Sequence, residues 1–127
     1  TRKLFYALLR VVDAVAGGKT LFWDEIDSSL HPKIVEYILA FFHCGDGAQL
    51  VCTTHDTNLL DLHKLRKDQI YFANKKDNGA TELYSLFDFK DFRDTMNLQK
   101  AYIQGRFDAV PYVDASAKTL KRLFADA

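Results

Sequence analysis

The chain has 127 residues, which is enough for a small domain with its own hydrophobic core. Apolar residues make up 48% and aromatic residues 13%, a composition that excludes a disordered chain. Lysine plus arginine and aspartate plus glutamate both number 17, so the net charge is zero and gives no support for nucleic-acid binding through the overall field. No apolar run is long enough to span a bilayer. The two cysteines do not form a disulfide framework, so a cytoplasmic location without membrane contact is expected.

The first predicted element is a helix. Apolar residues recur at three- and four-residue spacing between Leu4 and Val15, which predicts one apolar helix face. Gly17 and Gly18 follow and predict the end of the helix. Because the chain begins inside this helix and without Met, we expect it to be part of a longer protein.

A strand, a helix and a second strand are predicted next. Residues 20–23 form a short, largely apolar run, typical of a strand buried on both faces of a parallel sheet. Pro32 stands where a helix can begin, and Gly45 predicts its end. Residues 49–53 suit a second strand. Because parallel strands need such a crossover, we expect an α/β fold with a mainly parallel sheet and flanking helices.

The remainder of the chain predicts a hairpin and several short elements. Two β-type runs, residues 68–73 and 81–86, flank an Asn-Gly pair, which is a strong hairpin signal. Four further segments are predicted as loop, helix, turn and tail helix: residues 88–94, 98–104, 105–112 and 118–124. Neither a repeat nor a linker interrupts the sequence, so residues 1–127 are predicted to form a single domain.

The polar residues with the clearest chemistry directly follow the two predicted strands. Asp24 and Glu25 come after the first strand, and His55 comes after the second. Open α/β sheets bind ligands at the carboxyl ends of their strands. One carboxylate suits Mg²⁺ held with phosphates and waters, and the neighbouring carboxylate can polarise an attacking water. A histidine at this edge can donate a hydrogen bond to a γ-phosphate or hold that water.

Structural alternatives exist for each of these residues. An Asp-Glu pair alone suits two solvated acids at the start of a turn, but the apolar run before Asp24 favours function. Asp27 and Ser28 suit contacts with a partner subunit or with water near a γ-phosphate. The structural alternative is that Asp27, Ser28 or Ser29 caps the following helix, and for Ser28 and Ser29 it has at least equal weight. A lone histidine is more often structural, whereas the acids expected beside His55 favour a functional role.

Other polar residues carry a weaker signal. Adjacent His43 and Cys44, without a second pair, are only a weak indication of zinc. Arg106 is expected to anchor a surface turn, with pairing to an acid or a phosphate as the alternative.

Two stretches resemble motifs of a known family. Residues 20–32 resemble the Walker B and D-loop stretch of ABC-type ATPases of the RecF, SMC and OLD-like group, with Thr20 departing from the usual apolar residue. Residues 49–56 resemble the strand and switch-histidine loop of the same group. Residues 1–3 are similar to the positions after its Ser-x-Gly signature. Residues 101–112 are similar to the ending of stand-alone bacterial ATP-binding proteins, several of them linked to phage defence.

This resemblance implies the C-terminal lobe of an ABC-type P-loop NTPase. It implies that Asp24 supports Mg²⁺, that Glu25 activates water, and that His55 senses the γ-phosphate of ATP. It also implies that Asp27 and Ser28 act in the D-loop and face a second subunit, in a homodimer formed through the nucleotide site.

The family's phosphate-binding loop is missing, since no Gly-x-x-x-x-Gly-Lys-Ser/Thr occurs in the sequence. Residues 17–20 end in Gly-Lys-Thr, but they precede a predicted strand, whereas a P-loop follows a strand and opens a helix. We therefore predict that residues 1–127 alone bind ATP weakly or not at all. Hydrolysis would require a P-loop lobe and a second copy.

Two other functions compete with this interpretation. A Toprim-like metal-dependent nuclease also places clustered acids after parallel strands, but it does not need residues 53–56. A non-catalytic interaction module is the second alternative, favoured by the missing P-loop and disfavoured by the intact acids and His55. A nucleic acid and an effector protein are both compatible with the sequence as the partner on which such an ATPase would act.

Overall fold

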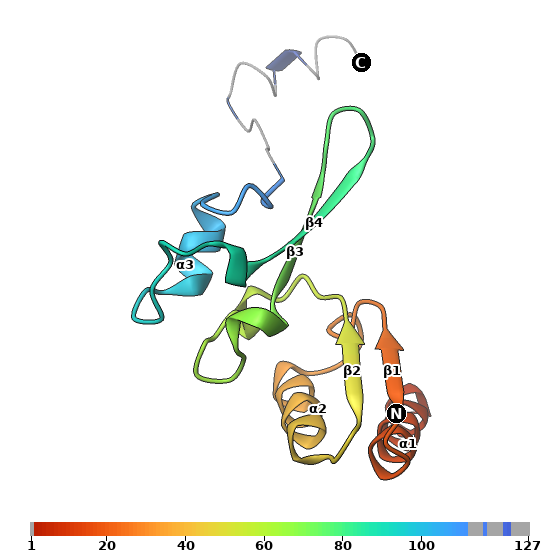
Figure 1. The fold of residues 1–127 in the computed structure, drawn as a ribbon. Coiled ribbons are helices and arrows are strands. Elements are labelled where there is room, and N and C mark those ends of the chain that lie inside the picture. Colours follow the sequence, from red (N-terminus) through yellow and green to blue (C-terminus); the bar gives the residue numbers. More distant parts are fainter. Residues whose placement is uncertain (1, 112–115, 117–120, 123–127) are drawn as a thin grey trace. The chain divides into compact units, whose positions relative to one another are not determined.

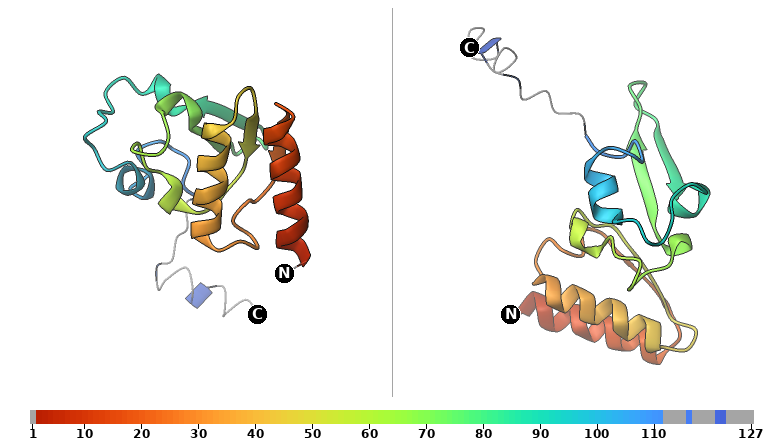
Figure 2. Two further views of the ribbon diagram at one scale, coloured as in Figure 1. Left: turned by 90° about the horizontal axis from the view of Figure 1, so that it is seen from below. Right: turned by 90° about the vertical axis from the view of Figure 1, so that its left-hand side faces the viewer.

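The chain forms two compact units, residues 1–59 and residues 60–127, in a computed structural model that describes residues 2–111, 116 and 121–122. Figures 1 and 2 trace the elements of each unit. A single domain over the whole chain stays a prediction. The tail helix predicted over residues 118–124 lies, apart from residues 121–122, outside the described residues.

The first unit has the predicted order of helix, strand, helix and strand. Its elements are α1 (Arg2–Ala16), β1 (Thr20–Trp23), α2 (Pro32–Cys44), β2 (Gln49–Cys52) and a final 3₁₀ turn, η1 (Thr57–Leu59). The two strands pair in parallel, with Trp23 opposite Cys52 at their carboxyl ends. In Figure 1 both strands point in the same direction and end at the same edge of this small sheet. The unit is therefore mixed α/β with a two-stranded parallel sheet.

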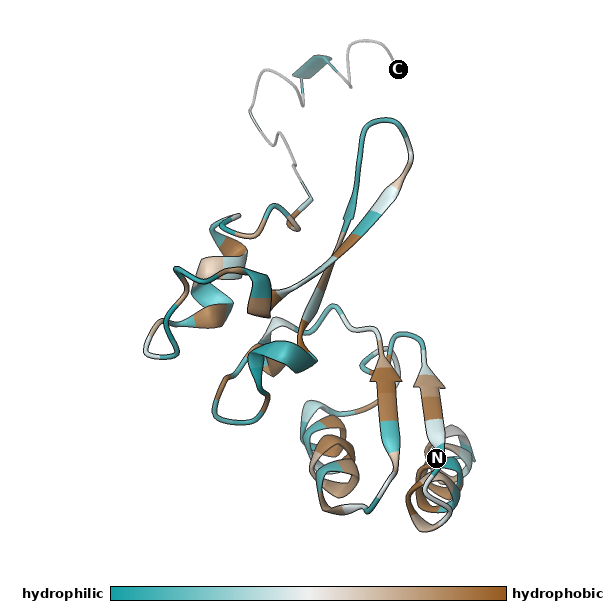
Figure 3. Cartoon of the chain, in the orientation of Figure 1, coloured by the Kyte–Doolittle hydropathy of each residue, from teal (hydrophilic) through white to brown (hydrophobic). Residues whose placement is uncertain are grey.

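Both helices pack on the same face of this sheet. Helix α1 contacts β1 and α2, and α2 contacts β2 (Figure 2). Alternate strand side chains, among them Leu21 and Trp23, pack against a wholly apolar core. Its buried members are Val11, Ala14, Ile26, Val35, Ile38, Phe42 and Leu59. Figure 3 shows the apolar residues that run along β1 and β2.

The other face of the sheet carries exposed apolar side chains. Phe22 is 75% exposed and Val51 is 44% exposed. The continuous apolar run predicts burial of β1 on both faces, whereas the described residues cover only one. Successive side chains of a strand point to opposite faces, so a helix layer on one side leaves every second side chain uncovered.

Helix α1 ends where the glycine pair predicts. Gly18 has a φ of 59°, in the left-handed region that glycine adopts readily, and the N–H of Lys19 bonds to the carbonyl oxygen of Ala14 at 2.8 Å. The ammonium group of Lys19 pairs with Asp13 at 2.9 Å, and the chain then enters β1. The Gly-Lys-Thr sequence therefore joins a helix to a strand, which confirms that it is not a P-loop.

His31, not residues 27–29, caps the N-terminus of α2. Its Nδ1 accepts a hydrogen bond from the backbone N–H of Lys33 at 3.2 Å. Pro32 follows at the start of the helix, where its missing N–H leaves no bond unmade. The capping alternative for residues 27–29 is therefore wrong.

None of the described helices is long and apolar enough to cross a membrane.

The second unit is built around the predicted hairpin. Its elements are η2 (Lys67–Gln69), β3 (Tyr71–Lys75), β4 (Thr81–Ser85), η3 (Leu86–Asp88) and α3 (Leu98–Ile103). Strands β3 and β4 pair antiparallel, and Gly79 in their turn has a φ of 85°. The hairpin and the helix predicted at residues 98–104 are thus both confirmed.

An aromatic core holds the second unit together. The ring of Phe107, 1% exposed, stacks on Phe72 with 4.8 Å between the ring centroids. Phe89 and Phe92 meet the same ring edge to face, at 5.1 and 5.4 Å. Aromatic pairs in this geometry stabilise a core beyond the area that they bury. The predicted turn at residues 105–112 therefore also supplies a central core residue.

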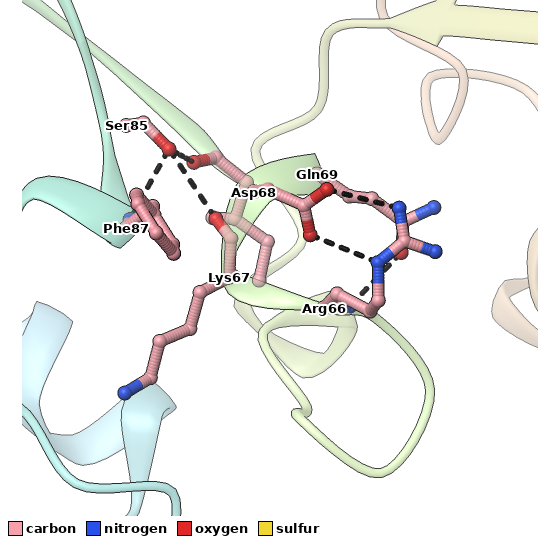
Figure 4. Close-up of polar contacts among 7 residues, drawn as sticks. Arg66, Lys67, Asp68, Gln69, Ser85 and Phe87 are labelled. Carbon is pink, nitrogen blue, oxygen red and sulfur yellow. Dashed lines mark hydrogen bonds and ion pairs between the residues drawn. The ribbon is translucent and has the colours of Figure 1, made fainter.

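Polar contacts join the start and the end of the hairpin (Figure 4). The hydroxyl of Ser85 accepts a hydrogen bond from the N–H of Phe87 at 3.1 Å and reaches the carbonyl oxygen of Lys67 at 3.4 Å. Beside them, the guanidinium of Arg66 makes two 2.9 Å bonds to Asp68. The contact between Ser85 and Lys67 fixes η2 against the end of β4, whereas the bonds between Arg66 and Asp68 are local to η2.

Arg106 both pairs with an acid, which the sequence left as the alternative, and anchors its turn. Its Nη2 pairs with Asp91 at 2.8 Å, and its guanidinium lies 5.5 Å from the ring centre of Phe92. The hydrogen bond from Arg106 lowers the pKa of Asp91. The arginine thus ties the turn that begins at Gly105 to the preceding loop.

Candidate functional site

The predicted site residues all belong to the first unit and gather at the carboxyl ends of β1 and β2. Residues 24–27 follow β1 directly, and residues 53–55 follow β2. Parallel pairing brings the two strand ends to one edge of the sheet (Figure 1). The position predicted from the order strand, helix, strand is therefore the position observed.

Thr53 links the two loops at this edge. Its backbone N–H donates to the carbonyl oxygen of Trp23 at 3.0 Å, and its own carbonyl oxygen accepts from Ile26 at 3.0 Å. Its hydroxyl donates to Oδ1 of Asp24 at 2.5 Å and accepts from the backbone N–H of Glu25 at 2.8 Å. No role for Thr53 is predicted from the sequence, although a hydroxyl residue at the end of a strand, two residues before the candidate histidine, is a usable signal.

Glu25 occupies an unusual backbone conformation. Its φ is 49°, in the left-handed region that residues with a side chain seldom adopt. Ile26, only 1% exposed, anchors the next position in the core, and the carbonyl oxygen of Glu25 accepts a bond from Ser28 at 3.0 Å. Such conformations cost energy, persist when the surroundings enforce them, and concentrate at functional sites. The turn exposes the carboxylates of both Asp24 and Glu25.

Asp27 reaches from the first loop to the second. Its carboxylate accepts a hydrogen bond from the backbone N–H of His55 at 3.3 Å and another from the side chain of Thr54. Burial raises the pKa of Asp27, but these hydrogen bonds, a contact to its own backbone and the charge of His55 together outweigh burial and lower it. Asp27 thus holds the loop that carries the exposed His55. Nucleotide contact by Asp27 or Ser28 stays a prediction.

Removing the charge of Asp27 should change how stability depends on pH. Because its pKa in the folded chain lies below the unfolded value of about 3.9, its carboxylate stabilises the fold fully above that value. The contribution is lost as the pH falls through the lowered pKa. Urea unfolding should therefore show the largest deficit of Asp27→Asn above about pH 5, and the deficit should shrink as the pH falls below the unfolded pKa of about 3.9. A deficit that is constant across this range would contradict the assignment.

The arrangement fits Mg²⁺ that is bound to phosphates. The site is not a metal centre built from protein ligands alone, because among the described residues no three His, Cys, Asp or Glu side chains gather in a metal-binding group. Mg²⁺ in nucleotide sites keeps several waters and is held by one or two carboxylates together with substrate phosphates. Thr53 occupies one oxygen of Asp24, so the other can face a cation. Asp24, with Glu25 beside it, therefore suits a nucleotide-bound ion.

The comparison with protein families concerns the same unit of the chain. The model of the family described as "AAA domain, putative AbiEii toxin, Type IV TA system" matches residues 1–61. The match spans the first unit, including every candidate site residue. It supports an ATPase of the AAA, P-loop type that binds nucleotide, typically with Mg²⁺. No curated protein and no solved structure matches the chain.

Proposed function

We propose that the first unit provides the catalytic edge of an ABC-type ATPase, which hydrolyses ATP by in-line attack of water. One observation carries the proposal: the acids after β1 and the histidine loop after β2 are tied into a single edge by hydrogen bonds of Thr53 and Asp27. Two acids and a histidine at the carboxyl ends of neighbouring parallel strands can supply an Mg²⁺ ligand, a group that positions the attacking water and a hydrogen-bond donor to the transferred phosphate. The family match over the same residues supports it.

Each residue has a distinct role in this proposal. Asp24 holds Mg²⁺, which when bound neutralises charge on the phosphates. The exposed carboxylate of Glu25 orients the attacking water and accepts its proton. The exposed ring of His55 donates a hydrogen bond towards the γ-phosphate. The charged carboxylate of Asp27 keeps the backbone of His55 in place.

Completion of the site requires groups outside this sequence. We infer that a P-loop lobe supplies the phosphate cradle, because residues 1–127 contain no such motif. Ser28 is exposed and follows the acids directly, so it can face a second copy across the nucleotide in a homodimer. The exposed side chains of Phe22 and Val51 offer the P-loop lobe an apolar face to cover.

The process that ATP hydrolysis drives is a separate proposal. The resemblance in sequence links this type of ATPase to phage defence, and the description of the matching family names a toxin of a type IV toxin–antitoxin system. We propose a defence role in which nucleotide turnover opens and closes the dimer and thereby gates an effector protein or a nucleic-acid target.

ATP binding tests the role of Asp24. In the full-length protein, Mg²⁺ should raise the affinity for ATP, and Asp24→Asn should reduce that gain on the order of tenfold or more, because a charged metal contact is lost. Asp46→Asn, an exposed aspartate after α2, is the matched control and should behave as wild type. Calorimetric titration measures both variants. An ATP affinity that does not depend on Mg²⁺ would contradict the proposal. In a separate nuclease assay, Mg²⁺-dependent DNA cleavage that is lost in Asp24→Asn would favour the Toprim-like nuclease.

A further inference from the structure

Thr53 engages the loop after β1 with all of its polar groups. Its N–H, hydroxyl and carbonyl oxygen bond to four consecutive residues, 23–26. The two backbone bonds lie beyond the last strand pair, Trp23 and Cys52, and any residue with a backbone N–H could form them. The hydroxyl bonds depend on the side chain, and they reach the two acids to which the proposed function assigns the metal and the water.

The hydroxyl of Thr53 acts as donor and acceptor at the same time. It donates to Oδ1 of Asp24 at 2.5 Å, which restricts how that carboxylate can rotate. It accepts from the N–H of Glu25 at 2.8 Å, at the residue with a φ of 49°. A single hydroxyl oxygen does both, whereas valine, which has nearly the shape of threonine, can neither donate nor accept.

Glu25 is consequently held from both sides of its strained backbone. The bond to Thr53 fixes its N–H, and the bond from Ser28 fixes its carbonyl oxygen at 3.0 Å. The direction in which its exposed carboxylate leaves the chain is therefore set by these bonds and by burial of the next residue, Ile26. Loss of the hydroxyl removes one of the restraints and leaves the carboxylate of Asp24 free to turn.

We propose that Thr53 is a positioning residue, whose hydroxyl aligns Asp24 for Mg²⁺ and Glu25 for the attacking water. The inference rests on the proposed ATPase function. It adds a residue directly after β2 whose contact with the chemistry is through the two acids. Partners of metal ligands of this kind affect metal affinity or activity by roughly 10- to 100-fold when they are replaced.

Two pairs of variants isolate the hydroxyl in the full-length protein. Wild type and Thr53→Val differ by the hydroxyl at constant shape, and Thr53→Ser and Thr53→Ala differ by the hydroxyl without the methyl group. The three readouts are kcat for ATP, the Kd of Mg²⁺ by calorimetry with a non-hydrolysable ATP analogue, and the melting temperature. Thr20→Val, at the opposite end of β1, is the matched control and should leave kcat and Kd unchanged.

The expected result is a roughly 10- to 100-fold loss in kcat and a weaker Mg²⁺ affinity in Thr53→Val and Thr53→Ala, with Thr53→Ser close to wild type. If Thr53→Val does not fold, the Ser and Ala pair decides by the same readouts. Wild-type kcat and Kd in folded Thr53→Val or Thr53→Ala would overturn the inference, as would equal losses in Ser and Ala. The ATPase proposal itself has a separate test: wild type should show Mg²⁺-dependent turnover, and Glu25→Gln should abolish it. Failure of either result would remove the ATPase proposal.

Discussion

Glu25→Gln should lower the rate of ATP hydrolysis by roughly 10²- to 10⁴-fold and leave ATP binding intact, because the amide cannot accept a proton from water. Gln has the size of Glu, and the backbone bonds that hold this position are unchanged. Single-turnover kinetics and equilibrium binding on the full-length protein separate the chemical step from binding.

Glu36→Gln is the matched control for this substitution. Glu36 lies on α2 and pairs with Lys33 at 3.4 Å, so its charge should matter little for turnover. We expect its rate to stay within about twofold of wild type, because Glu36 belongs to neither of the loops that carry the proposed site. Equal rates in Glu25→Gln and wild type would remove Glu25 from the chemistry, and loss of ATP binding in Glu25→Gln would point to a structural role.

Phe107→Ala should destabilise the second unit by about 3–5 kcal/mol, because a fully buried aromatic ring leaves a cavity that the core cannot close. Phe107 is 1% exposed, and its ring contacts those of Phe72, Phe89 and Phe92. Urea unfolding followed by circular dichroism gives the change in the free energy of unfolding.

Phe87→Ala provides the comparison within the same unit. Phe87 is 67% exposed, and its backbone bond to Ser85 survives the substitution. Its effect should lie within about 0.5 kcal/mol of zero, as for surface positions in general. Similar effects of the two substitutions would show that the stacked rings do not form the stabilising core of this unit.

Signals local in the sequence predicted most of the elements. Gly18 and Gly79 have the left-handed φ values that helix ends and hairpin turns require, and both elements lie where the glycines indicate. The apolar runs of β1 and β2 and the helix between them were also recognisable, because their patterns repeat over short windows. The order of these elements was enough to bring Asp24 and His55 to one edge.

Features that depend on tertiary contacts were not predicted. Phe107 lies in a segment rich in turn residues. Its place in the core depends on contacts with the rings of Phe72 in β3 and of Phe89 and Phe92 after η3. The cap of α2 by His31 depends on a side-chain rotamer that periodicity does not contain. The bonds of Thr53 join positions 28 and 29 residues apart, which no local window relates. The single covered face of β1 likewise depends on where two helices pack.

The central claim is that this edge of the sheet hydrolyses ATP, and the rate of phosphate release by the full-length protein tests it most directly. The measurement compares ATP with Mg²⁺ and ATP with the metal chelated. We predict turnover that requires Mg²⁺, because Asp24 is proposed to act on ATP through the ion, which would neutralise charge on the phosphates as water attacks. Absence of turnover in both conditions, or an equal rate after chelation, would contradict this account.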